Sequence, residues 1–222
     1  MKKIFLILFM ATLVSFIHKD RWDAHKDNWS ELMLAVYKGN TKKVNELINS
    51  GVDLNYVAKK ERFEFQLTAL EVALRKENEI AVKLLLATNK IAHPKTLIYV
   101  ACSYNSVSNV EMIIKHGGNP NDTLQKSNYG WSAFIMAINF GSNEVVEYLL
   151  KHGANVNQND GGTPLMYAVS RGYVEKVRLL LAYGADKKIK GYGGKTAIDE
   201  LDRTYADVSE KSKTEIRKLL SD

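Results

Sequence analysis

The feature of this sequence that most constrains its fold is an internal repeat with a period of about 33 residues. Each unit carries a small residue and, nine residues later in five of the units, a valine that precedes a pair of bulky aliphatic residues. The marker residues are Ala35, Ala73, Ala101, Ala137, Ala168 and Leu201, and the valines are Val44, Val82, Val110, Val146 and Val177. Because one such unit has no complete core of its own, the units are expected to stack on one another.

The turns carry a pattern as specific as the period. Thr163-Pro164-Leu165-Met166-Tyr167-Ala168 leads to Gly172, and Gly184-Ala185-Asp186 follows the paired leucines of that unit. The preceding unit ends in Gly153-Ala154-Asn155-Val156-Asn157. This resembles the ankyrin repeat, which has a T-P-L-H-x-A turn, a first helix closed by glycine, a second helix with V-x-x-L-L, and a G-A-x-x-N exit. The resemblance implies an all-α fold, a solenoid of stacked helix-turn-helix units with short β-hairpin-like turns.

The repeat pattern also predicts the domain organisation. Residues 29–222 are expected to form the ankyrin-repeat domain, with about five repeats and a C-terminal cap, after a lead-in at residues 18–28. The second and third units are expected to be the least regular, because Glu77 and Asn105 replace the first glycine. In the cap, Ile216 takes the place of the valine but lies fifteen residues after Leu201. That spacing predicts an extended loop around residues 205–213.

The N-terminus predicts export. Lys2 and Lys3 precede an uncharged apolar run, residues 4–17, which is shorter than the about 20 residues that a spanning helix needs. Residues 1–17 are therefore interpreted as a secretory signal peptide, and an uncleaved N-terminal membrane anchor is the alternative. The expected location is periplasmic or secreted, with anchoring at the membrane as the alternative.

Composition excludes several classes of protein. The single cysteine, Cys102, rules out an internal disulfide and Cys-rich zinc sites. The net charge is +6, but no helix dense in arginine and lysine and no zinc finger is present. Nucleic acid is therefore not an expected partner, and the packing of the repeats must hold the fold together.

Four groups of residues could suggest chemistry, and each has a structural explanation that we favour. Gly193-Gly194-Lys195-Thr196 ends like a phosphate-binding loop, but Ile189 stands where that motif needs glycine. His116 and His152 are expected to be cations near helix C-termini rather than metal ligands. Asp199, Glu200 and Asp202 could form a carboxylate pair, but they are expected in the first turn of a helix, where the helix dipole favours acidic residues. Cys102 is expected to be a buried, unreactive thiol rather than a nucleophile. We expect no catalytic residue, no metal and no cofactor.

The expected working surface is the concave face. In ankyrin proteins, targets are usually held by the turn tips and by solvent-facing positions two and three residues after the small marker residue. In this sequence those positions include Tyr37, Lys38, Arg75, Lys76, Tyr104, Asn139, Phe140 and Arg171, and the turn tips include Tyr129, Trp131 and Tyr192. Aromatic residues and arginine on one surface are typical of binding hot spots. Two alternatives have no binding role: tyrosine and arginine can form a solvated stripe, and Phe63 or Trp131 can pack onto neighbouring turns to support irregular hairpins.

Together these observations predict an exported, non-catalytic protein-protein interaction module. It is expected to be a monomer that binds another protein, with an acidic partner surface compatible with its lysine-rich turns, and to touch no membrane beyond the signal segment. Adaptor, stabiliser and immunity-type inhibitor of an extracytoplasmic protein are the compatible roles. The alternatives are a secreted effector that acts on host proteins, and a small-ligand-binding or enzymatic protein that uses the concave cleft.

Overall fold

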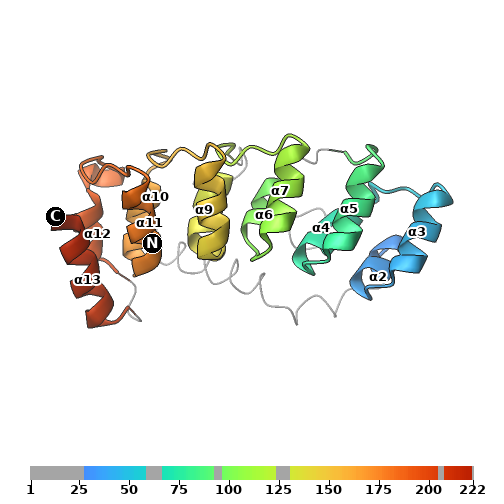
Figure 1. Cartoon of the computed structure of the whole chain (residues 1–222), viewed down its shortest axis with the longest axis horizontal. Helices are drawn as coiled ribbons and strands as arrows, with labels where there is room; N and C mark the ends of the chain where they lie inside the picture. Colours follow the sequence, from blue (N-terminus) through green and yellow to red (C-terminus); the bar gives the residue numbers. More distant parts are fainter. Residues whose placement is uncertain (1–27, 59–66, 93–96, 124–130, 205–207, 222) are drawn as a thin grey trace. The chain divides into compact units, whose positions relative to one another are not determined.

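The computed structural model describes residues 28–58, 67–92, 97–123, 131–204 and 208–221 (Figure 1). The predicted signal peptide lies outside the described residues. Within them the secondary structure is helical, with two isolated β-bridges in turns, Ala58 with Leu67 and Thr123 with Ser132. The fold class is therefore all-α, as expected. The chain divides between Val72 and Ala73 into two compact units.

The first unit holds one complete helical hairpin. Helix α2 (Glu31–Tyr37) and helix α3 (Thr41–Asn49) contact each other, and α4 (Ala69–Arg75) begins at the end of this unit. The hairpin buries aliphatic residues from both helices, namely Leu32, Met33, Val36, Val44 and Leu47. This matches the period of an amphipathic helix that faces one partner.

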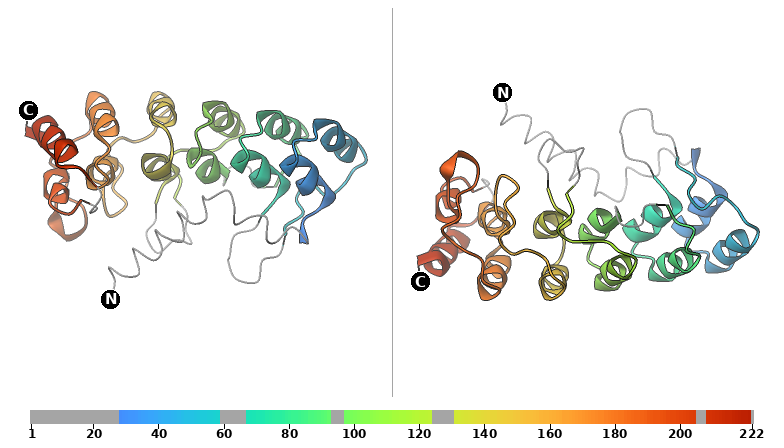
Figure 2. Two further views of the ribbon diagram at one scale, coloured as in Figure 1. Left: turned by 90° about the horizontal axis from the view of Figure 1, so that it is seen from below. Right: turned by 90° about the horizontal axis from the view of Figure 1, so that it is seen from above.

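The second unit repeats the hairpin. Its helices are α5 (Glu79–Ala87), α6 (Ile98–Cys102), α7 (Val107–Lys115), α8 (Ala133–Phe140), α9 (Asn143–Lys151), α10 (Pro164–Ser170), α11 (Val174–Ala182), α12 (Ala197–Leu201) and α13 (Glu210–Ser221), with a 3₁₀ turn, η3 (Tyr192–Gly194). In one layer, which we call the inner helices, α6, α8, α10 and α12 contact each other in order; α5, α7, α9, α11 and α13 form the outer layer (Figure 2).

Side-chain caps explain where the helices begin. Ser132 starts α8 and Thr163 starts α10, and each hydroxyl oxygen accepts a hydrogen bond from the backbone N–H three residues on, at 3.2 and 3.3 Å. Such a cap contributes about 1 kcal/mol. Pro164 follows at the first helical position, where its missing N–H leaves no bond unmade. The threonine-proline pair that marks the repeat in sequence is thus a helix start signal.

The inner helices approach one another closely. Ala101, Ala137 and Ala168 are 0–1% exposed. At the end of α8 a Cβ atom on Gly141 would lie 2.7 Å from the backbone oxygen of Cys102, in the preceding repeat. The φ of Gly141 is −75°, so this position needs glycine for space and not for backbone conformation. Small residues in this layer are therefore required by packing.

The second and third repeats carry the expected irregularities. Glu77 replaces the first glycine and adopts a left-handed backbone, with φ of 51°, which a side chain makes costly. In the third repeat, α6 has only 5 residues. Asn109 of α7 is 1% exposed, and both polar atoms of its amide lack a hydrogen-bond partner among the described residues. The equivalent residue of the next repeat is the buried Val145.

The prediction of an extended loop through residue 213 is wrong for its last residues. Helix α13 begins at Glu210, because the Ser209 hydroxyl oxygen accepts a hydrogen bond from the Ser212 N–H at 3.1 Å. An ion pair of 2.7 Å between Lys213 and Glu210 adds to the first turn. Residues 205–207 lie outside the described part. No helix in the described ranges has both the length and the apolar character needed to cross a membrane.

We predict that Asn109→Val raises the free energy of unfolding by about 1–3 kcal/mol, because it removes a buried amide that has no partner. Urea unfolding followed by circular dichroism measures the change. The matched control is Val145→Asn, which places the same amide in the regular repeat and should lower stability by a similar amount. A loss of stability in Asn109→Val would show that the amide is satisfied in solution.

Candidate protein-binding surface

The candidate binding residues of the second unit lie where the inner helices end. Arg75 closes α4, Tyr104 follows α6, Phe140 closes α8 and Arg171 caps α10. All four side chains, and that of Lys76, are half-buried. We call these five residues the inner-helix surface. They are held in place by the packed helices yet remain open to solvent on one side.

The equivalent residues of the first unit, Tyr37 and Lys38, belong to a separate compact body. Tyr37 is half-buried, and its ring meets that of Trp29 edge to face at a centroid distance of 5.4 Å. Lys38 is exposed. These two residues are therefore described with the first unit alone.

A hydrogen bond links two predicted residues of adjacent repeats. The Arg75 guanidinium donates to the hydroxyl of Tyr104. Burial is the main reason that the pKa of Tyr104 lies above its usual value, and the neighbouring Arg75 opposes the rise. The interaction places the Arg75 cation at the phenolic hydroxyl of Tyr104, and tyrosine and arginine are the residue types that hot spots favour.

Asn139 corrects the sequence prediction, which placed it facing solvent. It is 4% exposed. Its side-chain Nδ2 donates to the Ile135 carbonyl oxygen at 2.9 Å, and its Oδ1 accepts from Arg171 Nε at 3.2 Å. Both polar ends are thus engaged within the protein. Asn139 positions Arg171 and is not open to contact a partner.

A buried lysine that the sequence analysis missed secures the end of α8. Lys176 of α11 is 6% exposed, and its Nζ donates to the carbonyl oxygens of Ala137, Ile138 and Gly141 at 3.3, 2.7 and 2.8 Å. A helix end leaves such oxygens without backbone partners. Burial, with a smaller effect from Arg171, lowers the pKa of Lys176 to about 8. A lysine at the position where the preceding repeat has a core valine was the available signal.

The turn-tip residues have different surroundings. Trp131 was a candidate contact with a partner, and the structure instead matches the alternative of packing in the protein: it is 7% exposed, its Nε1 donates to the Tyr167 hydroxyl at 2.9 Å, and its ring packs edge to face on Tyr167. Tyr192 is 82% exposed at the tip of η3, and its N–H donates to the Gly161 carbonyl oxygen at 2.7 Å. Tyr129 lies outside the described residues. Of the three, Tyr192 is the aromatic residue presented to solvent.

Asparagine side chains tie successive turns together. Asn121 Nδ2 donates to the Gly153 carbonyl oxygen at 2.8 Å, and Asn121 Oδ1 accepts from the Asn155 N–H at 2.7 Å. One repeat later, Asn157 makes the same two bonds with Gly184 and Asp186, at 3.3 and 2.8 Å. The last residue of the G-A-x-x-N exit is thus a connector between repeats, which holds the turn tips in register.

The other candidate groups have local structural roles. His116 Nδ1 and His152 Nδ1 lie 2.8 and 2.7 Å from carbonyl oxygens one turn earlier in their own helices. Asp199 accepts two hydrogen bonds of 2.8 Å from Thr196 at the start of α12. Cys102 is fully buried, and burial raises the pKa of its thiol. Over the described ranges, histidine, cysteine and carboxylate side chains do not gather in threes as a metal site would require.

Comparison with known proteins agrees with this architecture. The family model for ankyrin repeats in three copies matches residues 32–123 and 97–191, so the chain belongs to the ankyrin-repeat family. The curated B-cell lymphoma 3 protein homolog of Mus musculus is 33% identical over 110 residues, which are 48% of this chain and 25% of that protein. The chain thus spans about a quarter of the length of that relative.

Two solved structures share the fold. The ankyrin repeat domain of Bcl-3, described as a unique member of the IkappaB protein family, has a TM-score of 0.65 and 24% identity over 88% of this chain and 86% of that one. A chain from the structure of a predatory endopeptidase from Bdellovibrio bacteriovorus in complex with an immunity protein has a TM-score of 0.66 and 24% identity, over 86% and 97%. The ankyrin-repeat domain is consistent with a protein-binding module.

We predict that Lys176 makes the free energy of unfolding rise with pH between about 8 and 10.5. The folded protein releases the Lys176 proton near the lower value, whereas the unfolded chain keeps it up to the higher one, so deprotonation favours the folded state. Urea unfolding at several pH values in this window, in wild type and in Lys176→Met, measures the effect as the difference between the two.

The control for this prediction is Lys151→Met, which removes an exposed amine whose pKa is raised by Glu147 and therefore titrates above the window. Wild type and the control should share the same rise in stability, and Lys176→Met should lack part of it. Identical pH profiles for all three proteins would contradict the assignment.

Proposed function

We propose that this protein is a non-catalytic module that binds a partner protein through the inner-helix surface and the exposed Tyr192. The observation that carries the proposal is the pairing of side chains across repeats: Arg75 with Tyr104, and Arg171 with the buried Asn139. These bonds restrict side chains that would otherwise lose conformational freedom on binding. Preorganisation of this kind lowers the cost of association.

The charge of this surface indicates an acidic partner. Arg75, Lys76 and Arg171 are cationic, and no member of the inner-helix surface is acidic. The exposed Glu77 lies next to Lys76 in the chain and reduces the positive charge at that end only. Complementary charge across an interface favours fast association and the choice of partner. We propose that the partner presents carboxylates to Arg75 and Arg171 and an apolar group to Phe140.

We further propose that the protein is exported and acts as an adaptor, stabiliser or inhibitor of an extracytoplasmic protein. The apolar run at residues 4–17 supports export. The shared fold with a chain from the complex of a predatory endopeptidase with an immunity protein supports the inhibitor role. Periplasmic or secreted protein is the proposed mature form, and N-terminal anchoring is the alternative.

To test the surface, we predict that Tyr104→Ala combined with Phe140→Ala and Arg171→Ala weakens partner binding at least about tenfold, because hot-spot truncations cost more than 1–2 kcal/mol. Cross-linked affinity capture from the extracytoplasmic fraction, with mass spectrometry, identifies proteins that wild type enriches. The dissociation constant of the purified partner is then measured for each variant.

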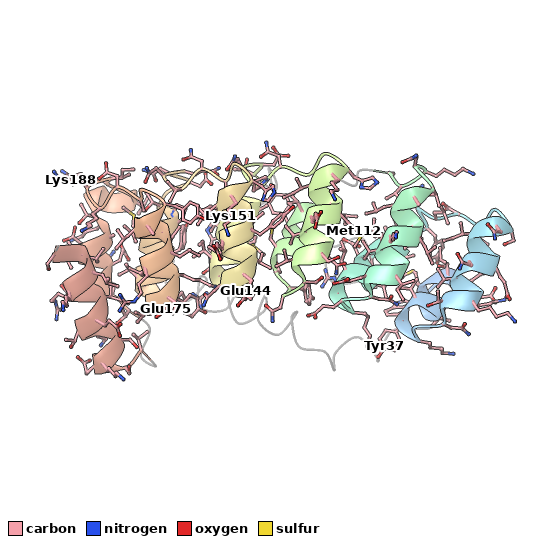
Figure 3. All side chains as sticks on the ribbon, viewed as in Figure 1. Tyr37, Met112, Glu144, Lys151, Glu175 and Lys188 are labelled. Atoms are coloured by element: carbon pink, nitrogen blue, oxygen red, sulfur yellow. The ribbon has the colours of Figure 1, made fainter. Side chains whose placement is uncertain are left out.

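The matched control for capture is Glu144→Ala with Lys151→Ala, because Figure 3 shows both residues on an outer helix. The control should bind like wild type, and thermal melting should confirm that both multiple variants are folded. Equal binding by wild type and the inner-helix variant would refute the proposed surface.

Export yields a separate prediction. In the native host, the mature chain should begin after Ser15, the best small-residue site at the end of the apolar run, and should be found outside the cytoplasm. Intact-mass measurement after cell fractionation reads both properties. A full-length chain in the membrane fraction would indicate the anchor, and a full-length chain in the cytoplasm would refute export.

A further inference from the structure

A second surface of the second unit lies beyond the inner helices. A groove of about 540 Å³ runs between the turn that follows α11 and the ends of α12 and α13. We call it the C-terminal basic groove, and its lining residues are Lys187, Lys188, Lys190, Thr196, Ile198 and Leu220, together with Ser221. Figure 3 labels Lys188 at this turn. The groove combines three cations with an apolar floor.

The lysines of the groove form no close ion pair among the described residues. Two carboxylates lie nearby and accept hydrogen bonds at turns: Asp186 Oδ1 accepts from the Lys188 N–H at 2.8 Å, and Asp199 Oδ2 caps α12 through Thr196. Asp199 also feels the positive charge of Lys190, which helps to lower the pKa of that carboxyl. Lys188 and Lys190 are exposed and Lys187 is half-buried, so these side chains are accessible to a ligand.

The repeat pattern explains why charge collects here. In the two preceding exits the last residue is an asparagine, Asn121 or Asn157, whose side chain accepts a backbone N–H of the next turn. Lys188 occupies that position in the last exit, and an ammonium group cannot accept a hydrogen bond. The hydrogen bonds that Asn121 and Asn157 make to the next turn therefore have no equivalent at Lys188, and Lys188 is exposed to solvent.

The apolar floor decides between kinds of anionic ligand. Ile198 is 42% exposed at the start of α12, and Leu220 lies half-buried beside the groove. None of the lining residues is aromatic, so the groove has no ring on which a nucleobase could stack. A ligand that matches both features carries carboxylates and an aliphatic side chain.

We propose that the C-terminal basic groove binds an acidic segment of a partner protein, with an aliphatic side chain of that segment packed on Ile198 and Leu220 and its carboxylates on the three lysines. This surface is separate from the inner-helix surface, so either can fail without the other. The proposal requires that binding weaken with salt, because exposed charges are screened within about 10 Å at 0.1 M salt.

The test uses the full chain and a fluorescently labelled peptide in which one leucine is flanked on both sides by glutamates. Fluorescence anisotropy measures its dissociation constant. Lys187→Glu with Lys190→Glu should weaken binding at least tenfold, and Ile198→Ala should weaken it several-fold. A peptide with glutamine in place of every glutamate should bind at least tenfold more weakly than the parent.

The matched control is Lys83→Glu with Lys211→Glu, which changes the net charge by the same amount at exposed lysines away from the groove. It should bind the peptide within about twofold of wild type, and melting curves should show that all variants are folded. If both double variants lost the same amount of peptide affinity, net charge alone would explain the effect, and the proposal would be overturned.

Three further results would also overturn it. The first is the absence of peptide binding by wild type up to about 1 mM, where the binding free energy is only about −4 kcal/mol. The second is an unchanged dissociation constant when the leucine of the peptide is replaced by glycine. The third is displacement of the labelled peptide by a single-stranded DNA oligomer as effectively as by unlabelled peptide. The second and third results would both describe a polyanion site without an apolar contact.

Discussion

The close approach of the inner helices is the constraint on which the rest of the second unit depends. At the end of α8, Gly141 lies so near the Cys102 carbonyl oxygen that a side chain would not fit, and the alanines of neighbouring helices are fully buried. Lys176, from the outer helix of the following repeat, supplies the missing donors with a single ammonium group. The end of α8 thus packs against the repeat before it, while the repeat after it donates hydrogen bonds to its carbonyl oxygens. Each repeat depends on its neighbours in this way.

The proposed binding surface follows from this dependence between repeats. Arg171 is oriented by Asn139 of the repeat before it, and Tyr104 by Arg75 of the repeat before that helix. In the proposed surface, side chains of one repeat are therefore positioned by side chains of the repeat before it. The turns are held in the same way, since Asn121 and Asn157 each join two successive exits. Where the asparagine gives way to Lys188, the chain presents unpaired charge instead of a connection, and the C-terminal basic groove lies at that place.

Sequence reasoning was accurate for features set within one repeat and poor for features set between repeats. The helices and the family followed from the spacing of alanine, valine and leucine, because a helix presents the same face every three or four residues. The solvent-facing position expected for Asn139 was wrong, because its side chain bonds to Arg171, more than thirty residues away. For Trp131 the sequence left contact with a partner and packing on a turn both open, and Tyr167, also more than thirty residues away, decided for packing. The loop expected through residue 213 was wrong at its end, because a local cap at Ser209 begins α13 early. Lys176 was overlooked because the carbonyl oxygens that it binds lie in the preceding repeat, more than thirty residues away.

The sequence alone therefore determined the all-α class, the ankyrin-repeat family and the register of the units, since periodicity and caps are properties of neighbouring residues. Tertiary structure decided which side chains of the predicted surface are available. Asn139 turned inward, Trp131 joined Tyr167, and Arg75 paired with Tyr104. It also placed Ile198 and Leu220 beside three lysines from a different segment. The physical reason is that a buried polar group must find a partner, and in a stacked repeat protein that partner lies one period away in the chain, where local patterns carry no information about it.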